Sequence, residues 1–214
     1  MKIKLCEYTK ILKKQTVLDG VSFEFTDDKI YGLHGKNGSG KTMLLRAICG
    51  LILPTKGYAE ADGQIIGSDI EFPESVGIII ENMTMLPEYS GIDNLKMLAK
   101  IKGIASESDI RNAIETVGLD PNDKKRVKAY SLGMKQKLNI AQAIMEKPKL
   151  LLLDEPTNAL DDETVASVRA LLLDMKKQGT LIIIASHNRD DLSTLCDEII
   201  EIDKGKIVKK EEVL

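Results

Sequence analysis

The fold of this chain is decided by the stretch Gly35-Lys36-Asn37-Gly38-Ser39-Gly40-Lys41-Thr42, which reads G-x-x-x-x-G-K-T. This spacing is typical of a phosphate-binding P-loop. The preceding segment, Lys29–His34, is predicted to be a strand, and the following segment, Met43–Cys49, a helix. A P-loop requires that order of strand, loop and helix, so the flanking sequence supports the motif. The alternative, a glycine-rich turn with a chance lysine, would leave this agreement unexplained.

The residue types of this loop suit a phosphate chain. Its glycines allow a tight backbone curl in which successive N–H groups point at one anion, and the following helix presents its positive end to the same anion. Lys41 would reach the β- and γ-phosphates of a nucleotide, and the Thr42 hydroxyl would bind Mg²⁺. We expect nucleotide contacts from the whole loop, namely Gly35, Lys36, Asn37, Gly38, Ser39, Gly40, Lys41 and Thr42.

The composition is that of an ordinary globular domain. The chain has 214 residues, of which 43% are hydrophobic and 29% charged. Its net charge of −3 gives no electrostatic reason to expect nucleic acid as a partner. No apolar run approaches a membrane span in length, and the first residues lack the apolar core of a signal peptide. Cys6, Cys49 and Cys196 have no metal-binding spacing and are expected to be reduced thiols. We therefore expect a cytoplasmic protein that touches a membrane only through a partner.

Strands and helices alternate around the P-loop, which predicts an α/β fold with a mostly parallel sheet, the P-loop NTPase core. Continuous apolar runs predict strands buried on both faces at Val76–Ile80, Leu150–Leu153 and Leu181–Ala185. An amphipathic helix is predicted at Asp162–Gln178. The amino-terminal part is expected to form an antiparallel β subdomain, with a hairpin turn at Asp62-Gly63.

The middle of the chain is predicted to be helical. Helical periodicity covers Ile92–Ile101 and Asp109–Val117, with Ser108 as the expected N-cap of the second helix. Ser131 is expected to cap a further helix that runs to Met145.

The expected domain organisation follows from this helical stretch. We predict one domain over residues 1–214, in which a helical lobe, 87–145, is inserted into an α/β core made of 1–86 and 146–214.

Two carboxylates directly follow a buried strand. Leu150–Leu153 leads into Asp154 and Glu155, and the carboxyl end of such a strand opens into the crevice where α/β sheets bind ligands. Asp154 would bind Mg²⁺, and Glu155 would activate the water that attacks the γ-phosphate. The alternative is a solvated strand end before the turn at Pro156.

Several motifs in one order resemble those of the ATP-binding subunits of ABC transporters, over essentially the whole chain. Gly35–Thr42 matches the Walker A motif and Leu150–Glu155 the Walker B motif. Tyr130–Gln136 resembles the signature motif, in a form similar to that of bacterial ABC-2-type exporters. Asn158–Asp161 resembles the D-loop, and His187 the switch histidine.

The resemblance implies that ATP is hydrolysed with Mg²⁺ at the interface of two ATPase chains, identical or different. Ser131 and Gly133 would contact the γ-phosphate held by the other chain, so that two ATP molecules lie between the pair. Asp161 would help to orient the opposite subunit. From the residues alone, an ordinary helix cap explains Ser131 or Asp161 as well.

The same resemblance assigns the chemistry to three side chains. Glu155 would be the general base, while His187 and Lys41 would stabilise the charge that develops on the transferred phosphoryl group. His187 is expected beside Glu155, because each follows a buried strand of the sheet. Without the other motifs, His187 would be interpreted as a structural histidine.

The chain departs from the family's usual pattern in the signature, where Leu132 and Met134 replace the commonest glycine and glutamine, and at Glu81 and Leu12. Glu81 stands where the Q-loop usually has glutamine; a carboxylate can still bind Mg²⁺, so we expect a stronger dependence on the metal, and the alternative is a solvated glutamate. Leu12 stands where the family usually stacks adenine on an aromatic ring. Leu12 and Val17 would then offer only apolar contact, and base selectivity is expected to be weak.

The function implied is that of a motor subunit, peripheral on the inner face of the cell membrane. A transmembrane permease would dock near Asn82–Leu98, and export is expected from the signature and Glu81. One alternative is a soluble ABC ATPase that acts as a switch on nucleic acid or ribosomes. Another is a P-loop kinase for a small molecule, which would leave the signature and His187 unexplained. The transported substrate would be set by the membrane partner.

Overall fold

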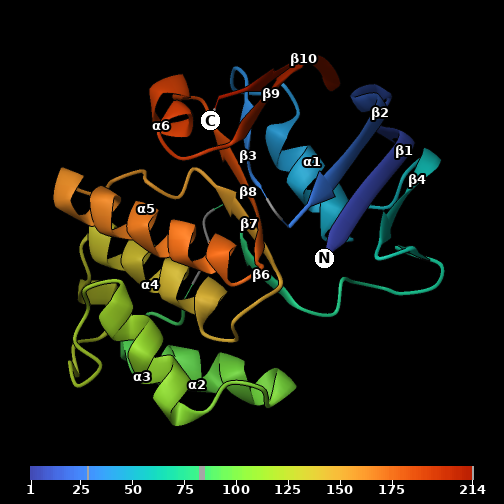
Figure 1. Ribbon diagram of the computed structural model, residues 1–214. Coiled ribbons are helices and arrows are strands. Elements are labelled where there is room, and N and C mark those ends of the chain that lie inside the picture. The colour runs from blue at the N-terminus through green and yellow to red at the C-terminus, as the bar shows by residue number, and fades with distance from the viewer. Residues whose placement is uncertain (28, 82–84, 214) are drawn as a thin grey trace.

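The P-loop lies between a strand and a helix, as its sequence predicts. The computed structural model describes residues 1–27, 29–81 and 85–213. β3 (Ile30–His34) runs into the loop, and α1 (Lys41–Ile48) begins at the last residues of the motif. The loop thus joins the carboxyl end of a strand to the amino end of a helix (Figure 1).

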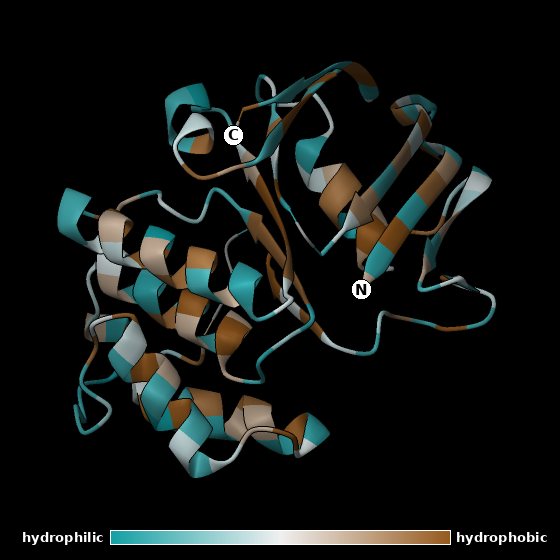
Figure 2. Cartoon of the chain, viewed as in Figure 1, coloured by the Kyte–Doolittle hydropathy of each residue, from teal (hydrophilic) through white to brown (hydrophobic). Residues whose placement is uncertain are grey.

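The larger sheet is mostly parallel, which confirms the predicted fold class. In spatial order it consists of β10 (Lys206–Glu212), β9 (Glu198–Asp203), β3, β8 (Leu181–Ser186), β7 (Leu150–Asp154) and β6 (Val76–Ile79). Only β10 pairs antiparallel to its neighbour; the other pairs are parallel. Both faces of the sheet are covered, which explains why its central strands are continuously hydrophobic (Figure 2). The carboxyl ends of β3, β7 and β8 therefore meet at one edge.

The amino-terminal part forms a second, antiparallel sheet. Its strands are β2 (Gln15–Thr26), β1 (Lys2–Leu12), β4 (Lys56–Ala61) and β5 (Gln64–Ile65), in that spatial order. The hairpin at Asp62-Gly63 is confirmed: both turn residues have positive φ, 48° and 82°, as the tight two-residue turns between strands require.

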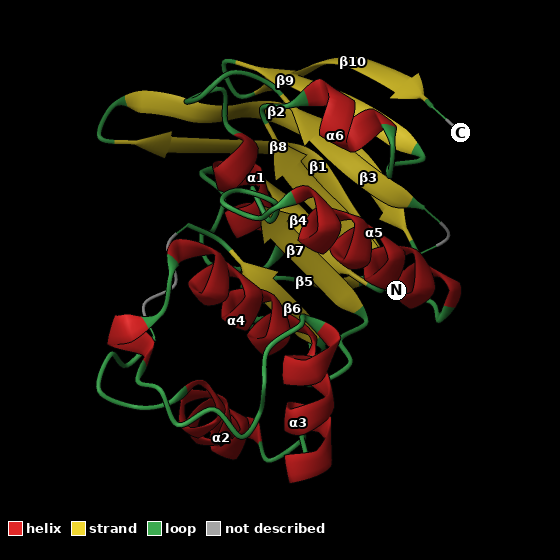
Figure 3. Cartoon of the chain, turned by 90° about the vertical axis from the view of Figure 1, so that its left-hand side faces the viewer, coloured by secondary structure: helices red, strands yellow, loops and turns green. Residues whose placement is uncertain are grey.

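The stretch between β6 and β7 is helical, as expected. Its elements are α2 (Gly91–Lys102), α3 (Glu107–Thr116), a 3₁₀ turn (Val127–Ala129) and α4 (Leu132–Ile144). Ser131 caps α4 by accepting a hydrogen bond from the Met134 N–H at 3.2 Å, which confirms that prediction. The helices of this lobe lie on the far side of the parallel sheet from the antiparallel strands (Figures 1 and 3).

The predicted cap of α3 is wrong by two residues. Ser106, not Ser108, is the N-cap: its hydroxyl accepts from the Asp109 N–H, and the Asp109 carboxylate accepts from the Ser106 N–H. This reciprocal pair is a capping box, and it requires an acceptor three residues after the cap. Asp109 supplies that acceptor, so the helix begins at Glu107.

The parallel sheet separates two hydrophobic cores. On one face α1 and the antiparallel sheet pack against it, with Leu44 and Leu152 among the buried contacts. On the other face lie α5 (Asp162–Lys177), α6 (Arg189–Ser193) and the helical lobe, with Leu151 and Val168 buried. Successive residues of β7 thus enter opposite cores, because side chains alternate across a strand. The predicted boundaries between the α/β core, 1–86 and 146–214, and the helical lobe, 87–145, stay a prediction.

All three cysteines are free thiols, as their spacing predicts, and Cys49 and Cys196 are buried core residues. No helix in the described ranges is both long enough and apolar enough to cross a membrane.

The lobe approaches the core closely at Gly77 of β6. A Cβ on this residue would lie 1.9 Å from the backbone carbonyl oxygen of Ala143 in α4. No side-chain movement relieves a clash with backbone, so the helix can approach the strand only because residue 77 is glycine.

We expect Gly77→Ala to lower the free energy of unfolding by about 3 kcal/mol, the upper end of the cost of overpacking. The matched control is Gly103→Ala, where a Cβ meets open space and only the positive φ of 68° is unfavourable; we expect about 1 kcal/mol there. Urea denaturation of both variants measures the difference, and equal losses would contradict the close packing of α4 on β6.

Candidate functional site

The P-loop is built to hold an anion. The ammonium of Lys41, a buried side chain, donates to the carbonyl oxygens of Gly35 at 2.7 Å and Lys36 at 3.3 Å, so it lies within the curl of the loop. Gly40 has a φ of +116° immediately before α1, a conformation that favours glycine. The Ser39 hydroxyl oxygen is buried without a hydrogen-bond partner in the described structure. Such an unpaired polar group in a loop of this shape fits contact with phosphate.

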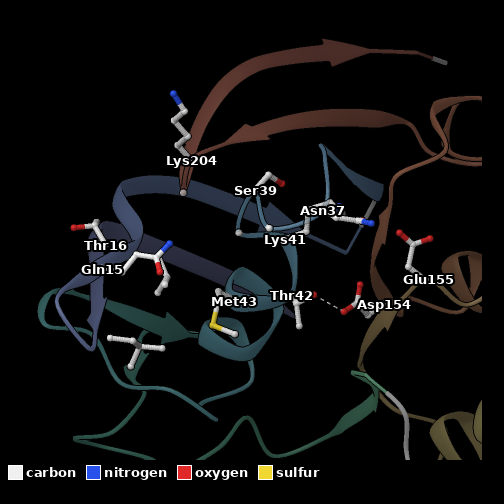
Figure 4. Close-up of a pocket in the computed structure, with 15 residues that line it drawn as sticks. Gln15, Thr16, Asn37, Ser39, Lys41, Thr42, Met43, Asp154, Glu155 and Lys204 are labelled. Carbon is white, nitrogen blue, oxygen red and sulfur yellow. Dashed lines mark hydrogen bonds between the residues drawn. The ribbon is translucent and has the colours of Figure 1, made fainter.

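A cavity of about 650 Å³ extends from this loop and is large enough for a nucleotide. The P-loop and the carboxylates of Asp154 and Glu155 line one end, and residues of the β1–β2 hairpin line the other (Figure 4). Leu12 and Val17 are among the hairpin residues, as expected for contacts to the base. Of the described lining residues none is aromatic.

The structure brings Thr42 and Asp154 together although they are 112 positions apart in the chain. The Thr42 hydroxyl donates to the Asp154 carboxylate at 2.6 Å (Figure 4). Burial raises the pKa of Asp154 above its usual range, and the charge of Glu155 adds to that effect. The hydrogen bond from Thr42 and the charge of Lys41 act in the opposite direction, and a cation beside the carboxylate would favour its ionised form further.

These two oxygen ligands fit Mg²⁺. Within the described residues no cluster of three or more histidine, cysteine or acidic side chains could hold a metal alone. Mg²⁺ commonly takes only one or two protein oxygens and completes its coordination with phosphate and water. The Thr42 hydroxyl and the Asp154 carboxylate lie beside a phosphate-binding loop and would supply two such oxygens.

Glu155 lies beside His187, as the sequence predicts. The Glu155 Oε1 atom accepts from the His187 backbone N–H at 2.9 Å and lies 2.7 Å from its Nδ1 atom, and the Ser186 hydroxyl donates to Oε2 at 3.2 Å. The contact arises because β7 and β8 are paired in parallel, with Asp154 opposite Ala185. Glu155 also has a φ of 50°, which is unusual for a residue with a side chain and is common at functional sites. Its role as general base stays a prediction.

Glu81 lies outside the cavity lining. Its carboxylate forms an ion pair with Arg46 of α1 at 2.7 Å, and its side chain is 57% exposed. Its negative charge is one of the influences that raise the pKa of Asp154, so it lies near the proposed metal ligands without contacting them. A role for Glu81 at the metal remains a prediction.

The signature and D-loop residues lie away from the cavity and contact each other. A Cβ on Gly133 would lie 3.0 Å from the Ala159 carbonyl oxygen, and the Gln136 amide donates to the Pro156 carbonyl oxygen at 2.9 Å. Asp161 caps α5 by accepting from the Thr164 N–H at 2.8 Å. The capping interpretations of Ser131 and Asp161 are thus confirmed, and a contact of either residue with phosphate stays a prediction.

Sequence reasoning missed part of the cavity. Gln15, Thr16, Met43 and Lys204 also line it. The loop that carries Lys204 reaches the site because the Gly205 N–H donates to the Ser39 carbonyl oxygen at 2.7 Å. No local pattern in the sequence indicates this contact, which joins segments 166 positions apart.

Comparison with known proteins agrees with this geometry. Residues 18–158 match the family model described as ABC transporter. The chain is 53% identical to the uncharacterised ABC transporter ATP-binding protein YybJ of Bacillus subtilis, over 99% of this chain and 97% of the relative. It is 36% identical to the lantibiotic transport ATP-binding protein SrtF of Streptococcus pyogenes, over 98% and 90% of the two chains. Its fold is similar to a bacterial ABC transporter cassette solved as a dimer, with a TM-score of 0.89 at 21% identity over 99% of both chains.

We expect Asp154→Asn to stabilise the nucleotide-free protein at neutral pH while it impairs metal-dependent turnover. The folded protein raises the pKa of Asp154, so the ionised side chain destabilises it above the ordinary pKa of aspartate. Removing that charge is expected to raise Tm at pH 7.

Thermal unfolding at several pH values checks this sign. The difference in Tm between the variant and the wild type should shrink as the pH falls, because the Asp154 carboxyl of the wild type becomes protonated. A lower Tm for the variant at pH 7 would contradict the assignment of Asp154 as an uncompensated carboxylate.

We expect Leu12→Tyr to strengthen nucleotide binding about fivefold, because an aromatic ring at the end of the cavity adds ~1 kcal/mol of stacking. The gain should be larger for ATP than for a triphosphate without a base. Equilibrium binding to both ligands, with Leu12→Ala as the control, measures it; an equal gain for both would place Leu12 away from the base.

Proposed function

The chain belongs to the ATP-binding proteins of the ABC transporter family, and we propose that it is the motor subunit of an exporter. As a member of this family it is a nucleotide-binding ATPase. The observation that carries the proposal is the cluster at the edge of the parallel sheet. There Glu155, held by His187 and Ser186, lies next to the linked pair Thr42 and Asp154.

We propose that the cluster hydrolyses ATP in the following way. Lys41 and the P-loop N–H groups hold the β- and γ-phosphates, and Glu155 accepts a proton from the attacking water. His187 holds the Glu155 carboxylate and stabilises the charge on the transferred phosphoryl group. Mg²⁺, bound through Thr42 and Asp154, would neutralise charge on the phosphates.

We propose that two chains close around two ATP molecules. The support is that Ser131 and Gly133 lie at the amino end of α4, outside the cavity of their own chain. A helix end with free N–H groups binds anions, so this surface suits the γ-phosphate of an opposite chain. ATP then favours the closed pair and loss of the γ-phosphate favours opening, which is a shift of population between two states.

We propose that a transmembrane permease docks on the described part of the segment Asn82–Leu98. Asn82, Met83 and Thr84 lie outside the described residues. Met85 packs against the core, whereas Leu86 and Tyr89 are each 49% exposed. Exposed apolar side chains in this segment suit contact with a partner. The protein would then lie on the inner face of the membrane.

Export is proposed from the resemblance of the signature and Glu81 to exporters. The similarity to a lantibiotic transport protein supports a role in moving an antimicrobial compound. Copurification with an integral membrane protein would support the motor role. ATP-dependent binding to nucleic acid would instead favour the soluble switch.

We expect Glu155→Gln to lower kcat at least 10²-fold while ATP binding is retained, because glutamine keeps the hydrogen bonds from His187 and removes the base. The same variant should form a dimer in the presence of ATP and Mg²⁺. Steady-state hydrolysis, equilibrium binding and light scattering measure these effects.

The control is Glu163→Gln, an exposed carboxylate in the first turn of α5, which should leave all three measurements unchanged. Normal hydrolysis by the Glu155 variant would exclude Glu155 as the base. A variant that binds ATP yet stays monomeric, even with the membrane partner present, would overturn the closed-dimer model.

A further inference from the structure

One face of α1 carries two polar side chains that serve different carboxylates. Thr42 and Arg46 are four residues apart, so they lie one turn from each other on the same face of the helix. Thr42 donates to Asp154, and Arg46 pairs with Glu81. The helix that begins at the P-loop thus holds the carboxylate of the proposed metal site and, one turn further on, a second carboxylate.

Glu81 is held in an unusual conformation at this point. It follows β6, whose partner β7 ends in Asp154, so both carboxylates emerge at the same edge of the sheet. The φ of Glu81 is 60°, in the left-handed region that residues with a Cβ rarely adopt. Such a conformation persists when the surrounding structure favours it, and in the described structure this side chain forms an ion pair with Arg46.

We propose that Arg46 is a positioning residue that competes with the metal site for the Glu81 carboxylate. The inference rests on the proposed function, because it requires Mg²⁺ at Thr42 and Asp154. In one arrangement Glu81 binds Arg46, as in this structure. In the other it turns towards the cation, directly or through water, and Arg46 is released.

The electrostatics make both arrangements accessible. Arg46 is 29% exposed and Glu81 is 57% exposed, and ion pairs in such solvent-accessible positions are weak. A divalent cation held by Thr42 and Asp154 would carry twice the charge of the guanidinium, and these two residues are half-buried whereas Glu81 is exposed, so its attraction would be less screened. A neutral glutamine at position 81 would be attracted less strongly to both the Arg46 guanidinium and the divalent cation. The exchange therefore depends on the carboxylate of Glu81.

A double-mutant cycle tests the competition. Arg46→Met keeps the length of the side chain and removes the charge, and Glu81→Gln removes the carboxylate; both are made singly and together. The readout is Mn²⁺ binding by electron paramagnetic resonance with a non-hydrolysable ATP analogue, at ~0.15 M salt so that distant charges are screened. Arg111→Met, which breaks an ion pair with Glu107 in the lobe, is the matched control.

We expect Arg46→Met to tighten Mn²⁺ binding about fivefold when Glu81 is present and less than twofold in the Glu81→Gln background. Arg46→Lys keeps the positive charge, so its affinity for Mn²⁺ should be close to that of the wild type. This second variant keeps the test valid if Arg46→Met folds poorly. Arg111→Met should have no effect.

Two negative outcomes can be told apart. If Arg46→Met changed the Mn²⁺ affinity equally with Glu81 and with Glu81→Gln, Arg46 would act on the metal by long-range electrostatics alone. That result would overturn the proposed competition. Failure of the wild-type chain to bind Mn²⁺ with nucleotide would overturn the proposed metal site itself, and with it this inference.

Discussion

The parallel pairing of β3, β8 and β7 is the constraint on which the site depends. Their register aligns His34 with Ser186 and Asp154 with Ala185. Three chain segments far apart in the sequence therefore end at one edge, where the P-loop, the carboxylates of Asp154 and Glu155, and His187 emerge. Since both faces of the sheet are covered by apolar packing, this alignment is held by two hydrophobic cores at once.

The site concentrates features that are unfavourable for the folded chain alone. Asp154 is partly buried with its pKa raised, Ser39 has a buried hydroxyl oxygen without a partner, and Glu155 and Glu81 have positive φ. Such features are expected where binding of a charged ligand compensates them. The surrounding hydrophobic cores supply the stability that makes them tolerable.

The P-loop and the amino end of α4, which we propose as a second anion-binding surface, lie on different parts of the chain. The P-loop opens into the cavity, whereas the amino end of α4 packs beside the D-loop of its own chain and lies outside that cavity. A hydrogen bond from Gln136 to the Pro156 carbonyl oxygen ties this second surface to the strand end that carries Glu155. The arrangement explains why a single chain contains both motifs without joining them in one pocket.

The sequence by itself determined the fold class, the P-loop, the buried strands and the carboxylates at the end of Leu150–Leu153, because these depend on local periodicity and on residues adjacent in the chain. It also indicated that Glu155 and His187 are neighbours, since both follow strands of one sheet. Only the tertiary structure decided the cap at Ser106, the approach of Lys204 to the cavity and the pairing of Glu81 with Arg46. The first depends on which acceptor the folded helix end offers, and the other two join segments that no periodicity relates, so their partners are set by how the elements pack in space.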